Sequence, residues 1–415
     1  MKKIKNPKVV WIVLIGLIIL AVYIRIISLP ILGFAPDFEA FNGWAGELKS
    51  FGLVHFYQNS SCNYLAIYTY LLRLAAFIQP AIHALNSAWS QDQVVWISYK
   101  LPCFIFDLLT AYFIFLFILR ETKNKLLGTL GVVFYLFNPV IFHNTYIYGQ
   151  NNVLLYLPTV ALLYFLTGKK FILAGISMAI LLLIKPTGII IVPFALLILI
   201  LQNKHDCKAY LKFFFAFYIA LQLLILPFSY RLPWDFIKVF IQSLTTGNGY
   251  KLTQMYSYNL WYLTTGKDWL PDSIVFWGKS YYFWGLLMFA VSYLVSLLLT
   301  YVYKTKFYLI LATVIYFSFF IFPTRVHEGY LLFAFPIFIL AVFIYKNYIL
   351  GLLYLLTTAV YSYNIWGYWP WELSRYLDIH YAGRYAVFSA YTITLTPLVL
   401  ICYFIYLNRK SKESS

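Results

Sequence analysis

Two carboxylates stand close together where the first apolar stretch of the chain ends. Asp37 and Glu39 are two residues apart in the segment Gly33–Glu39, and on an extended backbone both side chains project from the same side. A carboxylate in this place can deprotonate a hydroxyl group or hold a divalent cation. The structural alternative is an ordinary solvated loop, or a helix over Phe38–Phe51 that Asp37 caps.

A second concentration of charge is the short segment Phe322–Tyr330 between two apolar stretches. It holds Arg325, His327 and Glu328. A guanidinium group recognises a phosphate or carboxylate through two parallel hydrogen bonds, so Arg325 is a candidate ligand for such a group. The alternative is that the Glu328 carboxylate simply pairs with Arg325. The density of the cluster favours a binding role.

Amides and a lone cation mark the ends of other apolar stretches. The segment Tyr148–Asn152 includes Gln150 and Asn151, whose amides can bind sugar hydroxyls or cap a helix. Lys185, followed by Pro186, divides one long apolar run into two helices. Its ammonium group can bind a phosphate, or it can simply extend toward the membrane surface.

Two further ionisable residues lie inside an apolar stretch. Lys100 and Asp107 are seven residues apart, so they share one face of a helix and could interact. Ionisable groups within a membrane span are costly and favour the protein interior or a wet cavity. A structural pair is favoured here over a direct role in function.

The elements that must position these residues are apolar helices. The 415 residues are 62% hydrophobic and 11% charged, with a mean hydropathy of +0.77, whereas soluble globular proteins are about 25% charged. We predict an all-α polytopic membrane protein of about twelve spans, since a helix needs ~20 apolar residues to cross the hydrocarbon. The predicted spans are Val9–Leu29, Val94–Leu119, Leu126–Phe142, Asn152–Leu166, Phe171–Ile184, Gly188–Leu201, Tyr210–Phe228, Val275–Tyr301, Phe307–Phe322, Leu331–Tyr345, Tyr348–Trp366 and Tyr385–Leu407.

The spans form one predicted domain over residues 1–407, followed by a short tail, 408–415. Met1–Ile27 has a basic start and a long apolar run without a small-residue cleavage site before Pro30, which predicts a retained first helix. Tyr64–Leu85 is apolar but interrupted by polar residues, so we place it as a helix along the membrane interface, within an outer loop that covers residues 30–93.

The placement of charge predicts the topology. With the N-terminus in the cytoplasm, 18 of the 31 basic residues but only three acids, Glu121, Asp206 and Glu413, fall on the inner side, as the positive-inside rule requires. The 18 are Lys2, Lys3, Lys5, Lys8, Arg120, Lys123, Lys125, Lys169, Lys170, Lys204, Lys208, Lys212, Lys304, Lys306, Lys346, Arg409, Lys410 and Lys412. Both termini are then cytoplasmic, and the long segments are extracytoplasmic. Those segments are Pro30–Gln93, Ser229–Ile274, Pro323–Tyr330 and Gly367–Arg384.

Several classes of protein are disfavoured. The net charge of +17 comes from short basic runs rather than a basic helix, which indicates contact with anionic lipid and not with nucleic acid. The four cysteines are scattered and predict neither a disulfide framework nor a zinc site. Phosphate-binding, dinucleotide-binding, zinc-protease and serine-hydrolase motifs are missing from the sequence, which argues against nucleotide substrates. The segment Trp366–Glu372 is rich in Trp and fits an interfacial belt better than a sugar-stacking surface.

The order of several weak motifs resembles the GT-C superfamily of membrane glycosyltransferases, in particular the bacterial branch similar to GPI mannosyltransferase II. The resemblance covers Pro36 to about Tyr330. The motifs are Asp37-x-Glu39, Asn63-Tyr64 with Tyr68, Lys100-Leu101-Pro102 with Asp107, Asn138-Pro139, Tyr148-Gly149-Gln150, Lys185-Pro186, Asn259-Leu260-Trp261 and Thr324-Arg325-x-His327-Glu328-x-Tyr330. The chain departs from the family pattern after Tyr64, where two prolines are usual, after Gln150, where an acid is usual, and at Gly329, where Arg is common.

The resemblance implies transfer of a hexose, of mannose or glucose type, from a polyprenyl-phosphate sugar to a glycan, lipid or protein acceptor outside the cytoplasm, with inversion at the anomeric carbon. In its terms Asp37 is the catalytic base, supported by Glu39, and a divalent cation, Mg²⁺ or Mn²⁺, on these two residues is left open. The implied ligands of the donor phosphate are Arg325, His327 and Lys185, and those of the sugar or acceptor are Gln150, Asn151, Tyr64 and Glu328.

Two other functions suit a chain of this kind. A secondary transporter or a flippase of lipid-linked sugars also has about twelve spans, but such proteins carry repeat-related halves and charge at mid-membrane. Neither feature is visible in the sequence. A structural or assembly protein without catalysis would tolerate substitution of Asp37, Arg325 and His327.

Overall fold

The structure is a computed structural model that describes residues 7–228, 237–241, 251–304, 307–367 and 383–413. The predicted outer segments Ser229–Ile274 and Gly367–Arg384, with the Trp-rich Trp366–Glu372, therefore lie partly outside the described residues. Nearly all described elements are helices. Their order is α1 (Pro7–Ser28), α2 (Ala35–Asn59), α3 (Ala66–Leu85), α4 (Gln91–Thr122), α5 (Lys125–Leu136), α6 (Pro139–Phe142), η1 (His143–Tyr148), η2 (Asn152–Leu155), α7 (Tyr156–Thr167), α8 (Phe171–Leu182), η3 (Pro186–Ile191), α9 (Val192–Gln202), α10 (Cys207–Ile225), η4 (Leu226–Phe228), α12 (Leu260–Thr265), β1 (Val275–Phe276), β2 (Lys279–Ser280), α13 (Tyr281–Tyr303), α14 (Tyr308–Ile321), η5 (Glu328–Phe333), α15 (Ala334–Tyr345), α16 (Tyr348–Trp366) and α18 (Arg384–Glu413).

The fold confirms an all-α membrane protein but not the count of twelve spans. Among the described residues, seven helices are long and apolar enough to cross a membrane, and a bent pair over Lys125–Leu136 and Pro139–Tyr148 makes an eighth if it is one span. Four more apolar helices have only 10–17 residues. They are Asn152–Thr167, Phe171–Leu182, Pro186–Gln202 and Tyr308–Ile321.

The predicted span Leu126–Phe142 is broken in the structure. Helix α5 meets the stretch Pro139–Tyr148, which is α6 continued by η1, at a bend of 46°. Asn138 stands at the break, where its side-chain oxygen accepts hydrogen bonds from the backbone N–H groups of Val140 and Ile141. Pro139 then begins the new helix, in the first-turn position where a missing N–H costs nothing. The chain beyond the bend leads into η1, a π-helical turn that Gly149 follows in left-handed backbone.

The predicted span Val275–Tyr301 begins too early. Its first residues form a two-stranded antiparallel hairpin in which Val275 pairs with Ser280. The two turn residues, Trp277 and Gly278, have φ of 48° and 80°, and a two-residue turn with positive φ at both positions matches the twist of the flanking strands. Helix α13 starts only at Tyr281, where the Ser280 hydroxyl accepts a hydrogen bond from the Phe283 N–H.

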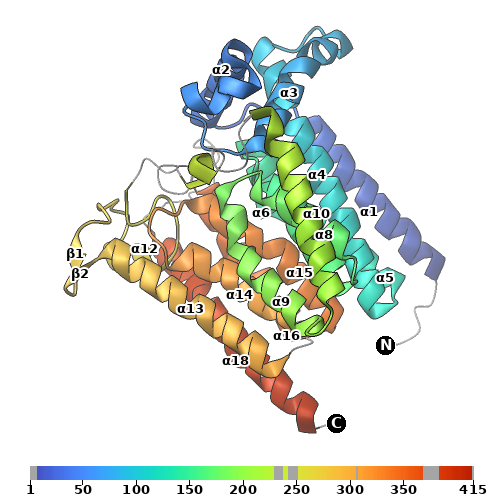
Figure 1. Cartoon of the computed structure of the whole chain (residues 1–415), viewed down its shortest axis with the longest axis vertical. Coiled ribbons are helices and arrows are strands. Elements are labelled where there is room, and N and C mark those ends of the chain that lie inside the picture. The colour runs from blue at the N-terminus through green and yellow to red at the C-terminus, as the bar shows by residue number, and fades with distance from the viewer. Residues whose placement is uncertain (1–6, 229–236, 242–250, 305–306, 368–382, 414–415) are drawn as a thin grey trace.

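The two ends of the bundle carry different elements. Helices α2, α3 and α12 and the β1–β2 hairpin lie at this end, and both described ends of the chain lie at the other (Figure 1). Helix α3 is a helix as predicted, and it is not among those apolar enough to span a membrane. We call these the α2–α3 end and the terminal end.

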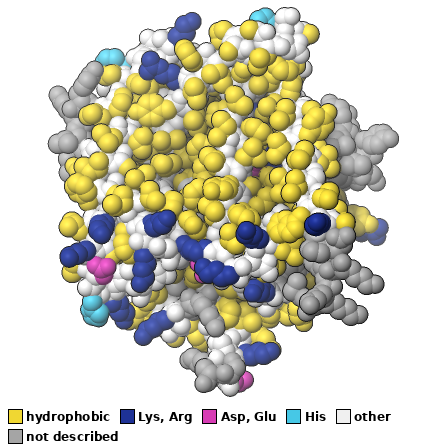
Figure 2. Space-filling view, turned by 90° about the vertical axis from the view of Figure 1, so that its right-hand side faces the viewer, with side chains coloured by type: hydrophobic (Ala, Val, Ile, Leu, Met, Phe, Trp, Pro, Cys, Tyr) yellow, Lys and Arg dark blue, Asp and Glu magenta, His cyan; other side chains and the backbone are white. Residues whose placement is uncertain are grey.

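The core of the bundle is formed by α14 and α15, which are buried along almost their whole length. Helices such as α1 and α13 expose their apolar side chains instead. Figure 2 shows a broad apolar surface with Lys and Arg side chains gathered along one border. An apolar belt of this kind next to a basic rim is typical of a protein embedded in a bilayer.

Candidate active site

Asp37 lies in the first turn of α2, which is fixed against η1. The Phe34 N–H donates to the Tyr148 carbonyl over 2.8 Å, and the two rings stack with centroids 4.9 Å apart. Gly33 packs so closely that a Cβ would lie 2.4 Å from the Tyr148 oxygen. The connection between α1 and α2 is therefore held on the segment that leads to Gln150.

Gln150 reaches Asp37 because a glycine turns the chain just before it. Gly149 has φ of +88°, and a Cβ there would lie 2.3 Å from the Trp96 ring, so only glycine fits. The Gln150 Nε2 donates to Asp37 Oδ2 over 2.9 Å. The Gln150 Oε1 in turn accepts a hydrogen bond from Asn152 Nδ2 over 3.1 Å.

Lys185 completes this run of polar side chains. Its Nζ donates to Asn152 Oδ1 over 2.9 Å and lies 4.4 Å from the centre of the Tyr64 ring. Pro186 restricts the preceding residue to extended backbone, and Lys185 has φ of −141° and ψ of 148°. The break between α8 and η3 thus aims the ammonium group inward. Hydrogen bonds now connect Asp37, Gln150, Asn152 and Lys185, which we call the Asp37–Lys185 chain.

His327 and Glu328 also lie near Asp37. Both residues interact electrostatically with the Asp37 carboxylate. The His327 ring lies 4.2 Å from the Tyr330 ring, and its Nδ1 is 3.6 Å from the Glu328 carboxylate. The start of η5 therefore brings an imidazole and a second carboxylate to the Asp37–Lys185 chain.

Gly329 has no space for a side chain. A Cβ there would lie 2.8 Å from Asn152 Nδ2 and 3.3 Å from His327 Cε1. The Gly329 N–H also donates to His327 Nδ1. The Arg that the GT-C resemblance favours at this position would displace Asn152. The cation that contacts Asn152 in this chain is Lys185.

The surroundings change the acidity of two of these groups. Burial is the main cause that raises the pKa of Asp37 to about 6. Glu328 acts in the same direction as burial, and His327, Lys185 and the Gln150 hydrogen bond act against it. Burial lowers the pKa of Lys185 to about 7, against the attraction of Asp37. Both groups therefore change protonation state near neutral pH.

Arg325 is engaged elsewhere. Its Nε lies 2.7 Å from Asp272 Oδ2, and the same oxygen accepts a hydrogen bond from the Thr324 hydroxyl. The guanidinium also lies over the Tyr282 ring, 4.3 Å from its centre. The partner of Arg325 is thus Asp272, and Glu328 faces His327 instead.

The structure separates the two carboxylates that the sequence placed together. Asp37 and Glu39 both lie inside α2, where each residue turns the helix by 100°, so their side chains point to nearly opposite sides. Asp37 is half-buried and Glu39 is exposed. The described residues include no group of three His, Cys, Asp or Glu side chains placed to hold a metal. These residues do not fit the divalent cation that the resemblance left open.

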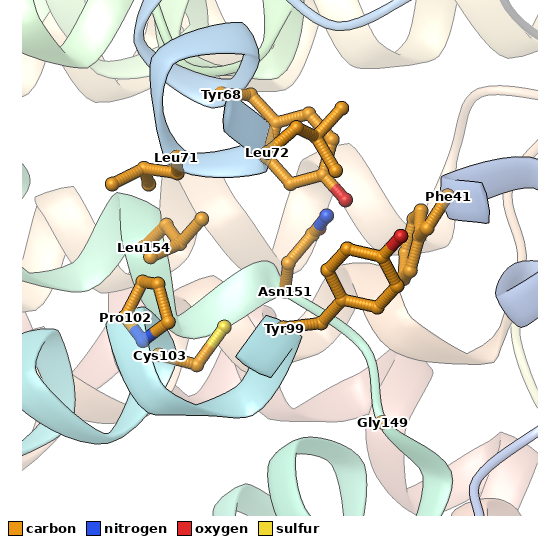
Figure 3. Close-up of a pocket in the computed structure, with 10 residues that line it drawn as sticks. All are labelled: Phe41, Tyr68, Leu71, Leu72, Tyr99, Pro102, Cys103, Gly149, Asn151 and Leu154. Atoms are coloured by element: carbon orange, nitrogen blue, oxygen red, sulfur yellow. The ribbon is translucent and has the colours of Figure 1, made fainter. Parts of the chain in front are cut away.

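Asn151 faces a small pocket beside the Asp37–Lys185 chain (Figure 3). The amide lies close to the hydroxyl groups of Tyr64 and Tyr68. The pocket has a volume of about 10 Å³, which is room for about one water molecule. Its lining is mostly apolar and comes from α2, α3, α4 and the chain around η2, with Phe41, Tyr68, Leu71, Leu72, Tyr99, Pro102, Cys103, Gly149, Asn151 and Leu154.

Lys100 and Asp107 do not pair with each other. Asp107 binds Arg25 of α1, with 2.7 Å between Arg25 Nε and Asp107 Oδ2. Lys100 donates to two backbone carbonyls instead. The sequence did contain a signal for this pair. Arg25 and Asp107 are opposite charges in two different apolar stretches, and a buried charge needs a partner.

Two residues of the site gave no usable signal in the sequence. Asn152 stands in the predicted amide segment, but nothing distinguished it from Asn151. Asp272 lies 53 residues before Arg325, and only the folded chain brings them together.

The fold and the site together define a class: a polytopic membrane protein with a partly buried cluster of carboxylate, amide and cationic side chains at the α2–α3 end of its helices. Residues 93–323, more than half of the chain, match the sequence model of Glycosyltransferase family 87. The chain belongs to this family and is a glycosyltransferase. The match confirms the predicted membrane glycosyltransferase of GT-C type, and the branch similar to GPI mannosyltransferase II stays a prediction. The matched region includes Gln150 and Lys185 but neither Asp37 nor His327. No curated protein matches the chain.

Proposed function

We propose that this glycosyltransferase moves a hexose from a polyprenyl-phosphate sugar to an extracytoplasmic acceptor, with inversion and with Asp37 as the general base. The observation that carries the proposal is the Asp37–Lys185 chain. It holds one carboxylate and one ammonium group in fixed relation through two amides. The acceptor is a glycan, lipid or protein hydroxyl.

The reaction needs a proton acceptor on one side of the anomeric carbon and positive charge on the other. The acceptor oxygen forms a bond to the anomeric carbon while its proton passes to Asp37. The bond between that carbon and the phosphate oxygen breaks, and the electron pair leaves with the phosphate. Attack in line with the departing oxygen inverts the configuration.

Lys185 and His327 are suited to stabilise the departing phosphate. Charge that develops on the leaving group in the transition state is stabilised best by cations and hydrogen-bond donors already fixed in place. Lys185 is buried and held by Asn152. His327 is held through Gly329 and Tyr330. We assign Gln150, Asn151 and Tyr64 to the sugar or the acceptor, since amides and a phenol offer donors and acceptors to hydroxyls.

Arg325 has a supporting place in this proposal. Its bond to Asp272 holds the turn Thr324–Gly329, which carries His327 toward Asp37. Glu39 has none, because its side chain points away from the cluster. Glu328, close to Asp37, raises the basicity of the Asp37 carboxylate.

The test is sugar transfer by the purified chain in lipid vesicles. The donors are radiolabelled polyprenyl-phosphate mannose and polyprenyl-phosphate glucose, and the acceptor is a membrane extract of the source cells. We expect release of polyprenyl phosphate together with labelled product. Asp37→Asn should slow transfer at least ~100-fold, the usual contribution of a general base.

Glu39→Gln is the matched control, because it neutralises an exposed carboxylate on the same helix turn. We expect it to keep most of the wild-type rate. Equal rates for Asp37→Asn and wild type would remove Asp37 from the mechanism. Transfer from a nucleotide sugar but from neither lipid-linked donor would overturn the proposed donor class.

A further inference from the structure

Lys100 is a buried cation that the proposed reaction does not use. Only 1% of its surface is exposed, although it lies in the apolar helix α4. Its Nζ donates to the backbone carbonyls of Ile31 and Tyr146, each over 2.6 Å. Both distances are short, just below the ~2.7–2.9 Å that is usual for charge-assisted N–H···O hydrogen bonds.

The two carbonyls belong to the two segments that form the catalytic contact. Ile31 lies in the connection between α1 and α2, six residues before Asp37. Tyr146 lies in η1, four residues before Gln150. One ammonium group therefore ties together the backbone on both sides of the hydrogen bond between Asp37 and Gln150.

Trp96, one helical turn before Lys100, supports the same junction. The Lys100 ammonium lies 5.1 Å from the centre of the Trp96 ring. The indole stacks on Phe38, next to Asp37, with centroids 5.2 Å apart. The same ring fills the space beside Gly33 and Gly149, where a Cβ would meet it at 2.7 and 2.3 Å.

Further along α4, Asp107 holds the other side of η1. Its Oδ2 accepts a hydrogen bond from the Tyr146 hydroxyl over 2.9 Å, so α4 binds Tyr146 through both its main chain and its side chain. Loss of Lys100 alone would leave the Tyr146 side chain anchored and release the two carbonyls. We therefore expect the α1–α2 connection to move relative to η1 while the helix bundle stays folded.

We propose that Lys100 is a positioning residue that sets the geometry between Asp37 and Gln150 by clamping the α1–α2 connection to η1. Lys100 touches neither Asp37 nor Gln150 and acts through the backbone. The inference rests on the proposed function for its effect on turnover, but the clamp itself is a statement about geometry. A misplacement of about 1 Å in a catalytic contact lowers turnover by about 100-fold.

The experiment compares Lys100→Met, which removes the donor, with Lys100→Arg, which keeps a buried donor of similar length. In the vesicle assay we expect Lys100→Met to lower kcat by ~10- to 100-fold with a smaller change in the KM for the donor. Lys100→Arg should recover part of this loss. Ile114→Ala, a cavity in the same helix far from the site, is the matched control for destabilisation and should keep kcat per folded molecule.

A second measurement does not depend on sugar transfer. Dicyclohexylcarbodiimide labels protonated carboxyl groups, and peptide mass spectrometry reports the pH at which Asp37 stops reacting. The groups that interact with Asp37 are His327, Lys185, Glu328, Gln150 and Tyr64, and the Gln150 hydrogen bond favours the carboxylate form. Lys100→Met should therefore shift the midpoint upward from the wild-type value, whereas Ile114→Ala should not.

The outcomes separate the two proposals. If wild type transfers sugar but Lys100→Met keeps both kcat and the labelling midpoint, the clamp is wrong and the proposed function stands. If wild type transfers no sugar from either lipid-linked donor, the proposed function fails. The labelling midpoint then decides the clamp alone, and an unchanged midpoint in Lys100→Met overturns it.

Discussion

At the scale of single residues, the pair Asp37 and Lys185 sets how activity depends on pH. Below about pH 6 the Asp37 carboxyl is protonated and cannot take a proton from the acceptor. Above about pH 7 Lys185 loses the charge that stabilises the departing phosphate. We expect kcat/KM for the donor to rise through the first value and fall through the second, with its maximum between them.

The variant Lys185→Arg tests the assignment of the alkaline limb. A guanidinium group stays protonated throughout this range, so the fall in kcat/KM should move to higher pH while the acid limb stays. An alkaline limb that is unchanged in Lys185→Arg would assign it to another group.

Local backbone conformation and local ion pairs explain why two predictions made from residue type and spacing differ from the structure. Two carboxylates two residues apart share a side only if the backbone is extended, and Asp37 and Glu39 lie in a helix. Arg325 was expected at a donor phosphate because a guanidinium suits that group. In the structure, Arg325 forms an ion pair with Asp272 instead.

At the scale of elements, three helices end in a lysine where glycine is the usual choice. Lys123, Lys304 and Lys346 have φ between 47° and 55° and stand at the C-caps of α4, α13 and α15. Left-handed backbone costs a residue with a side chain about 1 kcal/mol. Their positive charge is favourable at a helix C-terminus. The chain thus accepts local strain and keeps basic side chains at these helix ends.

Lys346 offers a direct measurement of that strain. Both Lys346→Gly and Lys346→Ala remove the charge, but only glycine relieves the left-handed backbone. We expect Lys346→Gly to exceed Lys346→Ala in free energy of unfolding by about 1 kcal/mol. Thermal unfolding in detergent, followed by circular dichroism, compares the two. Equal midpoints would show that the C-cap of α15 is not strained.

At the scale of the whole molecule, the two ends of the bundle differ in charge and in content. The described ends of the chain both lie at the terminal end, away from α2 and α3 (Figure 1). Because basic loops stay in the cytoplasm, we propose that the terminal end is cytoplasmic and that Asp37 works on the extracytoplasmic face. The anionic lipid of the inner leaflet would then contact the basic rim.

A native cysteine allows this orientation to be tested. Cys207 is exposed at the start of α10, next to basic residues, and Cys62 and Cys103 are buried. Cys402 is exposed inside the apolar span α18, so Cys402→Ser is included in every variant of the test. In intact spheroplasts of an expression host, a membrane-impermeant maleimide should label Cys207 only after permeabilisation. Asp92→Cys, placed in a Cys207→Ser background at the exposed start of α4, should be labelled without it. The reverse pattern would invert the topology.

The sequence by itself determined the class of this protein and most of its helices. Long apolar stretches partition out of water into the membrane. There the backbone N–H and C=O groups of a single stretch can form all their hydrogen bonds only within a helix, so the composition of each stretch is enough to predict it. The break at Lys185-Pro186 was predicted because proline restricts its own neighbourhood. The break at Asn138-Pro139 was not, since Leu126–Phe142 was predicted as one continuous span. The order of motifs also indicated a membrane glycosyltransferase, which the family match confirmed.

Only the tertiary structure decided which polar groups meet. Asp37 and Gln150 are 113 residues apart, and their contact depends on how Gly33, Gly149 and Trp96 pack. The same holds for the clamp by Lys100, whose acceptors are backbone carbonyls that any residue type offers. Partners of this kind leave no pattern in the sequence, because they are selected by the three-dimensional packing of helices and not by the spacing of residues along one of them.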